Sequence, residues 1–446
     1  MNFCLIKKLN TNAGFAIMES SKNKGVCAHS IRKFHYAENA VQKRGRAMKF
    51  LHISDLHLGK RINEFSMTED QKFILNQILH IAESEQADGV IIAGDIYDRP
   101  VPSAEAVQMF DWFLTGLADK GKKVFVVSGN HDSAERLSFG AQLMRGRDVY
   151  VSPVYNGEAL KIRLEDEFGP LNVYLLPFIK PASVRYVLEQ EDCSESKQED
   201  SPGSNQEDRP ESRQPETYQE AVRFAVERMK ADGRERNLLA AHQFVTGAGR
   251  CDSEEIAVGG LDNVDAGIFD VFDYVALGHI HSPQWVKRET LRYCGTPLKY
   301  SFSEAGQEKS VTMVEMGEKG HVEIKEVPLK GLRDMRKIKG TYLEVMAKSF
   351  YQGTNTEDYV QITLTDEEDI PDGFMRLRSV YPNLMQLLYD NRRMGEDRAL
   401  EAVKDMEKKS ELELFEDFYE LQNNQPMSSR QKEFAGNLME SLRQTL

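Results

Sequence analysis

The stretch Met48-Lys-Phe-Leu-His-Ile-Ser-Asp-Leu-His-Leu-Gly-Lys60 places two metal-capable side chains directly after a short apolar run. The run from Phe50 to Ile53 predicts a buried strand, and Asp55 and His57 follow it with one residue between them. Side chains at positions i and i+2 of an extended chain point to the same side, so both can reach one cation. Asp-x-His alone is common by chance, and its meaning depends on the rest of the chain.

The composition predicts a large cytosolic protein. A chain of 446 residues can bury a large core and is expected to hold two or three domains. It has no apolar run near the length that spans a membrane. Its five scattered cysteines contain no Cys-x-x-Cys pair, which favours reduced thiols in the cytoplasm.

Charge is distributed unevenly along the chain. Residues 189–220 carry 11 acids against 3 bases and residues 396–420 carry 10 against 4, so these segments (−8 and −6) account for the net charge of −14. The net charge is therefore a weak argument against a nucleic-acid partner. Residues 1–47 instead carry nine Lys or Arg against two Glu. An arm that binds DNA or membrane is one interpretation of 1–47; we favour an unstructured extension before a natural start at Met48.

From Met48 onward the pattern alternates between strands and helices. Thr68-Glu-Asp-Gln71 predicts a capping box at the start of a helix, and Ser103 is expected to open another. Buried strands are predicted at 89–93 and 123–128, which end in Gly94-Asp95-Ile96-Tyr97-Asp98 and Gly129-Asn130-His131-Asp132. Polar clusters at the carboxyl ends of strands are typical of α/β sites.

The second half of the chain repeats this pattern after an interruption. Strands are predicted at 173–178, 238–242, 274–278, 311–316 and 322–327, and a helix near 216–231. Residues 189–215 contain almost no apolar side chain, which predicts a mobile acidic insertion. His242 ends one of these strands, and His279 and His281 follow another.

The end of the chain predicts a small α+β module followed by helices. Residues 342–346 and 359–364 are interpreted as strands, followed by a helix bounded by proline. Two apolar stripes lie around a turn that contains a possible Ser428-x-x-Gln431 cap. Such stripes more often pack on their own domain; the preceding acidic stretch makes a detached hairpin awaiting a partner more credible.

Five clusters thus lie at predicted strand ends, and together they predict a two-metal centre. The candidate ligands are Asp55, His57, Asp95, Asn130, His242, His279 and His281. Asp95, a centrally placed carboxylate, is the candidate bridge between two ions. Mixed Asp, Asn and His ligands without thiolate favour Mn, Fe or Zn over Mg or Ca. Each cluster alone has a structural explanation, such as a core histidine at His242, but their joint order and context are unlikely to be accidental.

The motifs Asp-x-His, Gly-Asp-x-x-Asp, Gly-Asn-His-Asp, a lone His and Gly-His-x-His resemble those of calcineurin-like metallophosphoesterases. The opening stretch, Gly94 to Ser103 and Gly295 to Phe302 are similar to the SbcD family of nuclease subunits. This resemblance implies a four-layer α-β-β-α sandwich at 48–330, a small α+β capping domain at 331–392 and a C-terminal helical hairpin at 393–446. The extension 1–47 and the insertion 189–215 depart from the family pattern.

The resemblance also implies residue roles. Asp55, His57, Asp95 and His281 would hold one ion, and Asp95, Asn130, His242 and His279 the other. His131 would act as general acid or stabilise charge on the leaving oxygen, and Asp132 would orient His131. Asp98 is expected to lie behind the ligands.

The function implied is a Mn²⁺-dependent DNA nuclease, an exonuclease on double-stranded DNA and an endonuclease on single-stranded or hairpin DNA. It would act in DNA recombination, replication and repair together with an SbcC-like SMC-family ATPase. The expected assembly is a homodimer of this chain within a heterotetramer, and no association with a membrane is expected. The alternative is a phosphoprotein phosphatase or cyclic-nucleotide phosphodiesterase on the same fold; those relatives usually have Arg where this chain has Ser128. A scaffold without metals is disfavoured by the intact ligand set.

Overall fold

The computed structural model describes residues 46–195, 214–249, 251–254, 263–368, 370–390, 412, 415–416, 419 and 427–443, without the side chains of 192–195, 433, 437 and 440–443. Residues 1–45 of the predicted extension 1–47 lie outside the described residues. The predicted acidic insertion lies outside it from 196 to 213, and its first residues continue helix α5 (Pro181–Glu195).

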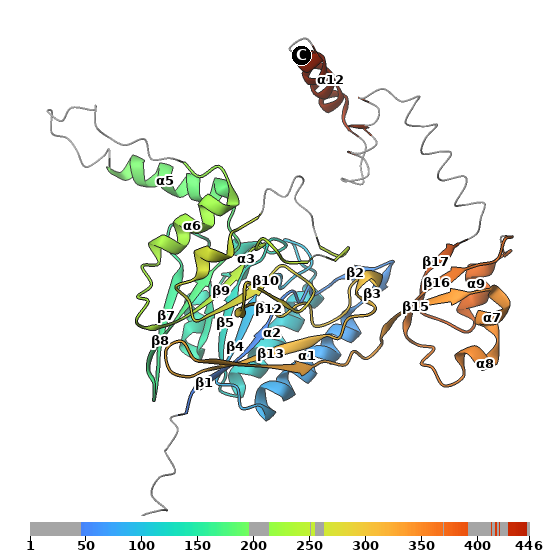
Figure 1. The fold of residues 1–446 in the computed structure, drawn as a ribbon, viewed down its shortest axis with the longest axis horizontal. Coiled ribbons are helices and arrows are strands. Elements are labelled where there is room, and N and C mark those ends of the chain that lie inside the picture. The colour runs from blue at the N-terminus through green and yellow to red at the C-terminus, as the bar shows by residue number, and fades with distance from the viewer. Residues whose placement is uncertain are drawn as a thin grey trace, which may run out of the picture. The chain divides into compact units, whose positions relative to one another are not determined.

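The first sheet contains the strand of the opening motif at its centre (Figure 1). Its order is β14-β13-β1-β4-β5-β6. The members are β1 (Met48–Ile53), β4 (Gly89–Ala93), β5 (Lys123–Val127), β6 (Val149–Val151), β13 (Ser310–Met316) and β14 (Val322–Pro328). β1, β4, β5 and β6 are parallel, and β13 and β14 continue the sheet in antiparallel fashion beyond β1. β4 is buried along its whole length, as expected of a parallel strand covered on both faces.

The second sheet has the order β11-β12-β10-β9-β8-β7. Its members are β7 (Leu160–Asp166), β8 (Gly169–Leu176), β9 (Arg236–His242), β10 (Tyr274–Gly278), β11 (Gln284–Val286) and β12 (Arg288–Tyr293). β8, β9, β10 and β12 are parallel, and β7 and β11 form antiparallel edges. Each predicted strand of this half of the chain is therefore present.

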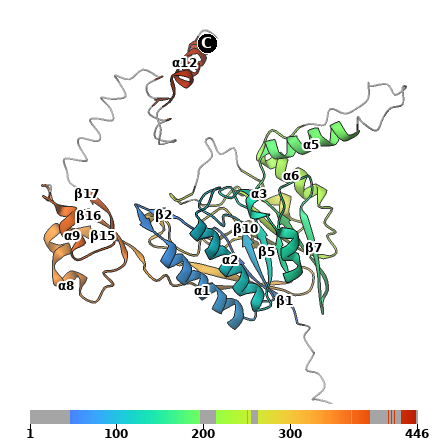
Figure 2. The ribbon, with the colours of Figure 1, turned by 180° about the vertical axis from the view of Figure 1, so that it is seen from behind.

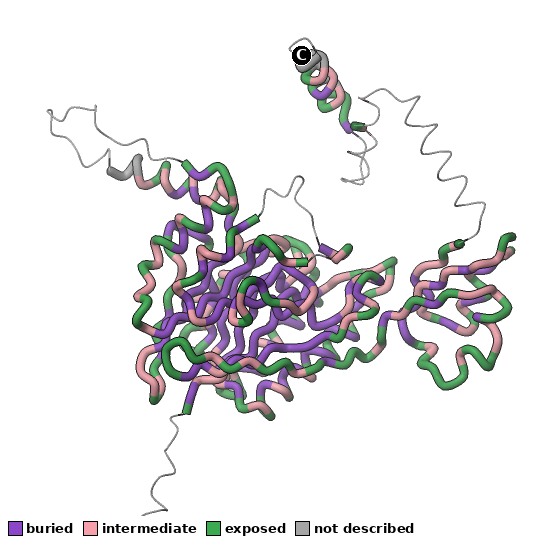
Figure 3. The backbone as a smooth tube through the Cα atoms, in the orientation of Figure 1, coloured by how far each residue is buried: buried purple, intermediate pink, exposed green. Residues whose placement is uncertain are grey.

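Apolar side chains divide the main body into layers. One buried cluster lies between the two sheets and includes Phe50, Ile91, Phe125 and Tyr274. α1 (Thr68–Ser84) and α2 (Ala104–Asp119) pack on the outer face of the first sheet, as Figure 2 shows from behind. α5 and α6 (Tyr218–Arg228) pack on the outer face of the second. Figure 3 shows the buried strands enclosed by helices with exposed outer faces, which confirms the α-β-β-α arrangement.

Shorter elements connect these layers. They are β2 (Arg61–Ile62), β3 (Phe65–Ser66), α3 (Ala134–Leu137), α4 (Ala141–Met144), and the 3-10 turns η1 (Arg145–Arg147), η4 (Ala266–Phe269) and η5 (Phe302–Glu304). Ser103 caps α2 by accepting a hydrogen bond from the Ala106 N–H, as predicted. The capping box predicted at Thr68 is wrong: the helix is present, but Met67 occupies its cap position and Thr68 is already helical. Gln71 is instead buried among distant backbone groups.

The small module contains a three-stranded parallel sheet with its own core. The strands are β15 (Met335–Gly340), β16 (Tyr359–Leu364) and β17 (Leu384–Tyr389), and the helices are α7 (Tyr342–Met346), α8 (Lys348–Tyr351) and α9 (Gly373–Arg378). The strand predicted at 342–346 is wrong, because Thr341 and Glu344 form a capping box that starts a helix there. The preceding segment supplies the strand instead.

The C-terminal region is described only in part. Helix α12 (Ser429–Arg443) begins where Ser428 and Gln431 exchange hydrogen bonds, so the predicted cap is present. Tyr419 lies against this turn through a 2.8 Å hydrogen bond from Gln431. Of the earlier part of the predicted hairpin only residues 412, 415–416 and 419 are described, and Lys432 of α12 donates a 2.6 Å hydrogen bond to Glu416. Among the described helices, none is both long and apolar enough to cross a membrane.

Candidate metal centre

The structure brings the candidate ligands to one edge shared by the two sheets. Asp55 and His57 follow β1, Asp95 follows β4, and Asn130 and His131 follow β5. His242 ends β9, and His279 and His281 follow β10. Within each sheet the parallel strands place their carboxyl ends at one edge, and the packing of the two sheets against each other brings Asp55 after β1 next to His279 after β10.

Three overlapping groups of ligand atoms each lie within 4.8 Å of one another. They are Asp55, His57 and His281; His57, Asp95 and His131; and Asp55, Asp95 and His242. Asp95 occurs in two of the groups and its carboxylate is the central acid. The Asn130 amide oxygen lies 3.0 Å from His242 Nε2 and 2.8 Å from His279 Nδ1, which joins the remaining candidates to the cluster.

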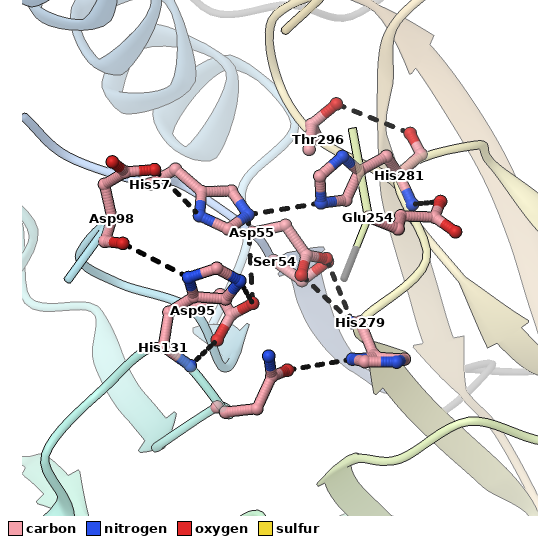
Figure 4. A network of polar contacts seen from close by, with 12 residues as sticks. Ser54, Asp55, His57, Asp95, Asp98, His131, Glu254, His279, His281 and Thr296 are labelled. Atoms are coloured by element: carbon pink, nitrogen blue, oxygen red, sulfur yellow. Dashed lines mark hydrogen bonds and ion pairs between the residues drawn. The ribbon is translucent and has the colours of Figure 1, made fainter. Parts of the chain in front are cut away.

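The ring nitrogens of His57 and His281 face each other in a way that fits a cation. His57 Nε2 lies 3.2 Å from His281 Nε2 and 3.8 Å from Asp95 Oδ2, inside a site that excludes most solvent (Figure 4). His57 Nδ1 is buried and has no hydrogen-bond partner in the described part of the chain. Imidazoles and carboxylates that converge without satisfying one another are suited to a divalent ion, which takes up their lone pairs.

The backbone holds these side chains in an unusual conformation. Asp55, His57, Asp95 and His279 all have positive φ, at 52°, 44°, 50° and 100°. Such φ values cost energy for residues other than glycine and gather at functional sites. Hydrogen bonds stabilise the turns: Asp55 N donates to Gly94 O at 3.0 Å and His57 N to Asp95 O at 3.0 Å. The clusters after β1 and β4 therefore form one interlocked loop pair.

Gly129 has no side chain, which lets the loop after β5 approach Asp95 closely. A Cβ atom at this position would lie 2.1 Å from Asp95 Oδ1, far inside contact distance. Gly129 N also donates a 2.9 Å hydrogen bond to Asp132, so the glycine is fixed on both sides. The Gly-Asn-His-Asp motif thus needs its first residue for space, since any side chain would displace the central carboxylate.

Asp55 and Asp95 are both buried, but their pKa values shift in opposite directions. Burial raises the pKa of Asp55 to about 8, although the charge of His242 opposes this. Burial also acts to raise the pKa of Asp95, but the charge and hydrogen bond of His242, with His57, hold it well below its usual range. Burial acts to lower the pKa of His242, but the charge and hydrogen bond of Asp95 outweigh this effect and raise the pKa to about 9. Asp95 Oδ2 and His242 Nε2 lie 3.3 Å apart, so each favours the charged form of the other.

His131 lies at the open side of the cluster. Its Nδ1–H donates to the Asp98 carbonyl at 3.1 Å, and its Nε2 lies 3.9 Å from Asp95 Oδ2. The backbone N–H of His131 donates to Asp95 Oδ1 at 2.9 Å. The ring is therefore held from behind with Nε2 directed at the ligands, as Figure 4 shows. This is the geometry of a proton donor or electrostatic stabiliser beside a reacting group.

The Asp132 carboxylate connects the loops after β4 and β5. It accepts from the backbone N–H groups of Ile96, Tyr97 and Gly129 at 2.9–3.1 Å. It therefore ties the loop after β5, which carries His131, to the loop after β4. Asp98 itself accepts from Lys60 at 2.6 Å and lies behind His57, as predicted.

Sequence reasoning missed the groups that hold the ligands from outside. Gln71 donates to the His57 carbonyl at 2.7 Å and to Tyr300 at 3.1 Å, and accepts from Gly59 N. Glu254 accepts from the His281 N–H at 2.8 Å. The signal in the sequence is the stretch Gly295 to Phe302, which resembles the SbcD family and contains Tyr300.

Comparisons with known proteins agree with this geometry. A family model described as calcineurin-like phosphoesterase matches residues 48–283. A second model, SbcD_C, described as the type 5 capsule protein repressor C-terminal domain, matches residues 331–423.

Two solved structures resemble the chain at low identity. One is phosphopantetheinyl hydrolase from Mycobacterium tuberculosis, with 16% identity and a TM-score of 0.31 over 57% of this chain and 91% of that one. The other is a dimetal phosphatase from Danio rerio, with 14% identity and a TM-score of 0.37 over 64% and 98%. At these TM-scores the family assignment rests on the sequence matches.

Proposed function

We propose that this chain, which belongs to the calcineurin-like phosphoesterase family, is a metal-dependent DNA nuclease of the SbcD type. It would act as an exonuclease on double-stranded DNA and an endonuclease on single-stranded or hairpin DNA, in recombination, replication and repair in the cytoplasm. The observation that carries this proposal is the Asp, Asn and His cluster in a chain whose C-terminal part matches the SbcD_C model.

The cluster has the donors for two divalent ions. We assign Asp55, His57, Asp95 and His281 to one ion and Asp95, Asn130, His242 and His279 to the other, with Mn²⁺ as the favoured metal. When bound, such ions activate water and stabilise charge at phosphorus. His131, whose Nδ1–H donates to the Asp98 carbonyl behind it, would use Nε2 to give a proton to the leaving oxygen or to stabilise its charge. Asp132 would maintain that position by tying the loops together.

A polar groove beside the cluster favours a polymeric phosphodiester over a small substrate. This cavity of about 450 Å³ is lined mainly by polar residues, among them Lys60, Arg61, Asn63, Asp252, Ser253 and Tyr300 from the main body and Lys337, Gln361 and Gln386 from the small module. Cations that contact phosphates and amides that contact base edges are typical of nucleic-acid surfaces. Ser128, which replaces the arginine usual in the related phosphatases, leaves a terminal phosphate without that clamp.

Exposed apolar side chains support the proposed partners. Phe139 and Leu143, in the α3–α4 region, are 84% and 85% exposed, which suits the interface of a homodimer. Phe434 on α12 is 71% exposed and suits docking on an SbcC-like SMC-family ATPase within a heterotetramer. The ATPase would also supply positive surface to a chain whose net charge is −14.

The test is cleavage of hairpin and linear duplex DNA by the full chain with Mn²⁺, with and without an SMC-family ATPase. A phosphomonoester and a cyclic nucleotide serve as competing substrates. We expect DNA cleavage that the ATPase stimulates. Faster hydrolysis of the phosphomonoester or cyclic nucleotide than of any DNA would contradict the nuclease proposal and favour the alternative on the same fold.

A further inference from the structure

Three polar residues outside the cluster meet behind His281, and none of them is a proposed ligand. Ser253 lies in the segment after β9, Glu304 ends η5, and Lys309 precedes β13. Glu304 is fully buried and Lys309 is 5% exposed. A buried ion pair is costly unless its geometry satisfies both partners, so its presence beside a ligand calls for an explanation.

The hydrogen bonds form a chain that ends on the His281 ring. Ser253 Oγ donates its single hydrogen to Glu304 Oε1 at 2.5 Å, so at His281 Nδ1, 2.6 Å away, it accepts. The proton of the neutral imidazole is therefore on Nδ1, and the lone pair on Nε2 faces His57. A second group that accepts from a metal-binding histidine fixes its tautomer and ring orientation and raises its basicity.

Lys309 fixes both the acid and the backbone of the same ligand. Its Nζ donates to Glu304 Oε2 at 2.5 Å, to Thr296 Oγ1 at 2.8 Å and to the His281 carbonyl at 2.9 Å. The amine thus neutralises the buried carboxylate and holds the main chain from which the ring projects. Side chain and backbone of His281 are constrained by one network.

We propose that Ser253, Glu304 and Lys309 are positioning residues that present His281 Nε2 to one of the two ions. This inference rests on the proposed metal centre and extends it to residues that are not themselves proposed metal ligands. Because the network contacts only His281 among the ligands, its loss should weaken the ion held by Asp55, His57, Asp95 and His281. The ion held by Asn130, His242 and His279 should be affected little.

The test is a calorimetric titration of Mn²⁺ into the full chain and its variants. The wild type should bind two ions, and Ser253→Ala should weaken one of them by about 10- to 100-fold while leaving the other unchanged. Ser253→Thr, which keeps the hydroxyl, should restore most of the lost affinity. Ser84→Ala, which removes an exposed hydroxyl bonded to the Ile81 carbonyl, is the matched control and should behave like the wild type.

The outcomes separate the two proposals. Two unchanged affinities in Ser253→Ala would overturn the positioning role, and so would equal weakening of both ions. Glu304→Gln should show the same selective loss as Ser253→Ala, and unchanged Mn²⁺ affinity in it would also count against the network. Binding of fewer than two ions by the wild type would instead overturn the proposed metal centre.

Discussion

Removal of one hydroxyl, by Tyr359→Phe, should detach the small module from the main body more easily. Tyr359 on β16 donates a 2.8 Å hydrogen bond to Asp70 Oδ2 on α1. Arg333, in the connection between the two parts, donates to the same carboxylate oxygen at 2.8 Å. Asp70 is 0% exposed, so no water replaces the lost donor readily.

The magnitude follows from the character of this hydrogen bond. A buried hydrogen bond to a charged group contributes about 1.5–3 kcal/mol, and the variant removes one such bond while Arg333 remains. Asp70 Oδ1 has no hydrogen-bond partner in the described chain, so the carboxylate has no spare interaction to compensate. We therefore expect the free energy of unfolding of the small module to fall by about 2 kcal/mol, roughly a 30-fold change in the equilibrium constant.

The assay is urea unfolding of the full chain, followed with native-state hydrogen exchange of the backbone amides of β15–β17. Tyr150→Phe is the matched control, because it removes a tyrosine hydroxyl that donates to Asp148 at 2.9 Å on the surface. The control should change stability by less than about 0.5 kcal/mol. Equal effects of Tyr359→Phe and Tyr150→Phe would refute the reasoning that burial gives the Asp70 contact its strength.

Three further predictions concern the metal centre. Gly129→Ala should lower Mn²⁺ affinity in calorimetry, because its Cβ would lie 2.1 Å from Asp95 Oδ1; wild-type affinity would contradict this. Burial acts to raise the pKa of Glu304, but His281 and Lys309 lower it from 4.5 to about 2. Ionised Glu304 should therefore stabilise the fold above pH 4.5, and this stabilisation should be lost as the pH falls toward 2. The difference in free energy of unfolding between the wild type and Glu304→Gln should thus shrink by about 3 kcal/mol from pH 4.5 to low pH. A difference that does not change with pH would contradict this prediction. EDTA should abolish DNA cleavage and excess Mn²⁺ restore it; cleavage that persists in EDTA would exclude metal dependence.

The sheet architecture could be predicted because its determinants are local. Buried runs such as 89–93 and 123–127 are continuous apolar segments that end in glycine and polar residues, a pattern typical of parallel strands. The candidate ligands follow these strands and so lie at the carboxyl edges of the sheets, but Asp55 and His279 come from different sheets, and the packing of the two sheets brings them together. The geometry of the cluster agrees with that expectation, while its metal occupancy stays a prediction.

Two local predictions, the strand at 342–346 and the capping box at Thr68, were wrong because other contacts engage the same residues. Tyr342-Leu-Glu-Val-Met346 contains residues with strand preference, but the capping box of Thr341 and Glu344 starts a helix. At Thr68 the same kind of motif failed, because Gln71 is taken by the loop of His57 and by Tyr300. Local propensity is a weak guide where tertiary contacts engage the same side chain.

The supporting groups could not be predicted from the sequence because their contacts are distant. Gln71 and Tyr300 are separated by 229 residues, and Ser253 and Glu304 by 51. No spacing rule links such pairs, and each residue type is common at surfaces. Only the folded chain shows that they converge on the backbone of His57 and on the ring of His281.

The most direct test of the central claim is cleavage of linear duplex DNA with Mn²⁺ by His131→Asn. The variant removes the imidazole held by Asp98 but none of the proposed ligands. We predict that it still binds two Mn²⁺ ions while cleavage falls by about 10²- to 10⁴-fold, the usual contribution of a general acid. Cleavage at the wild-type rate by a variant that retains both ions would contradict the proposed nuclease mechanism, in which His131 acts on the leaving oxygen.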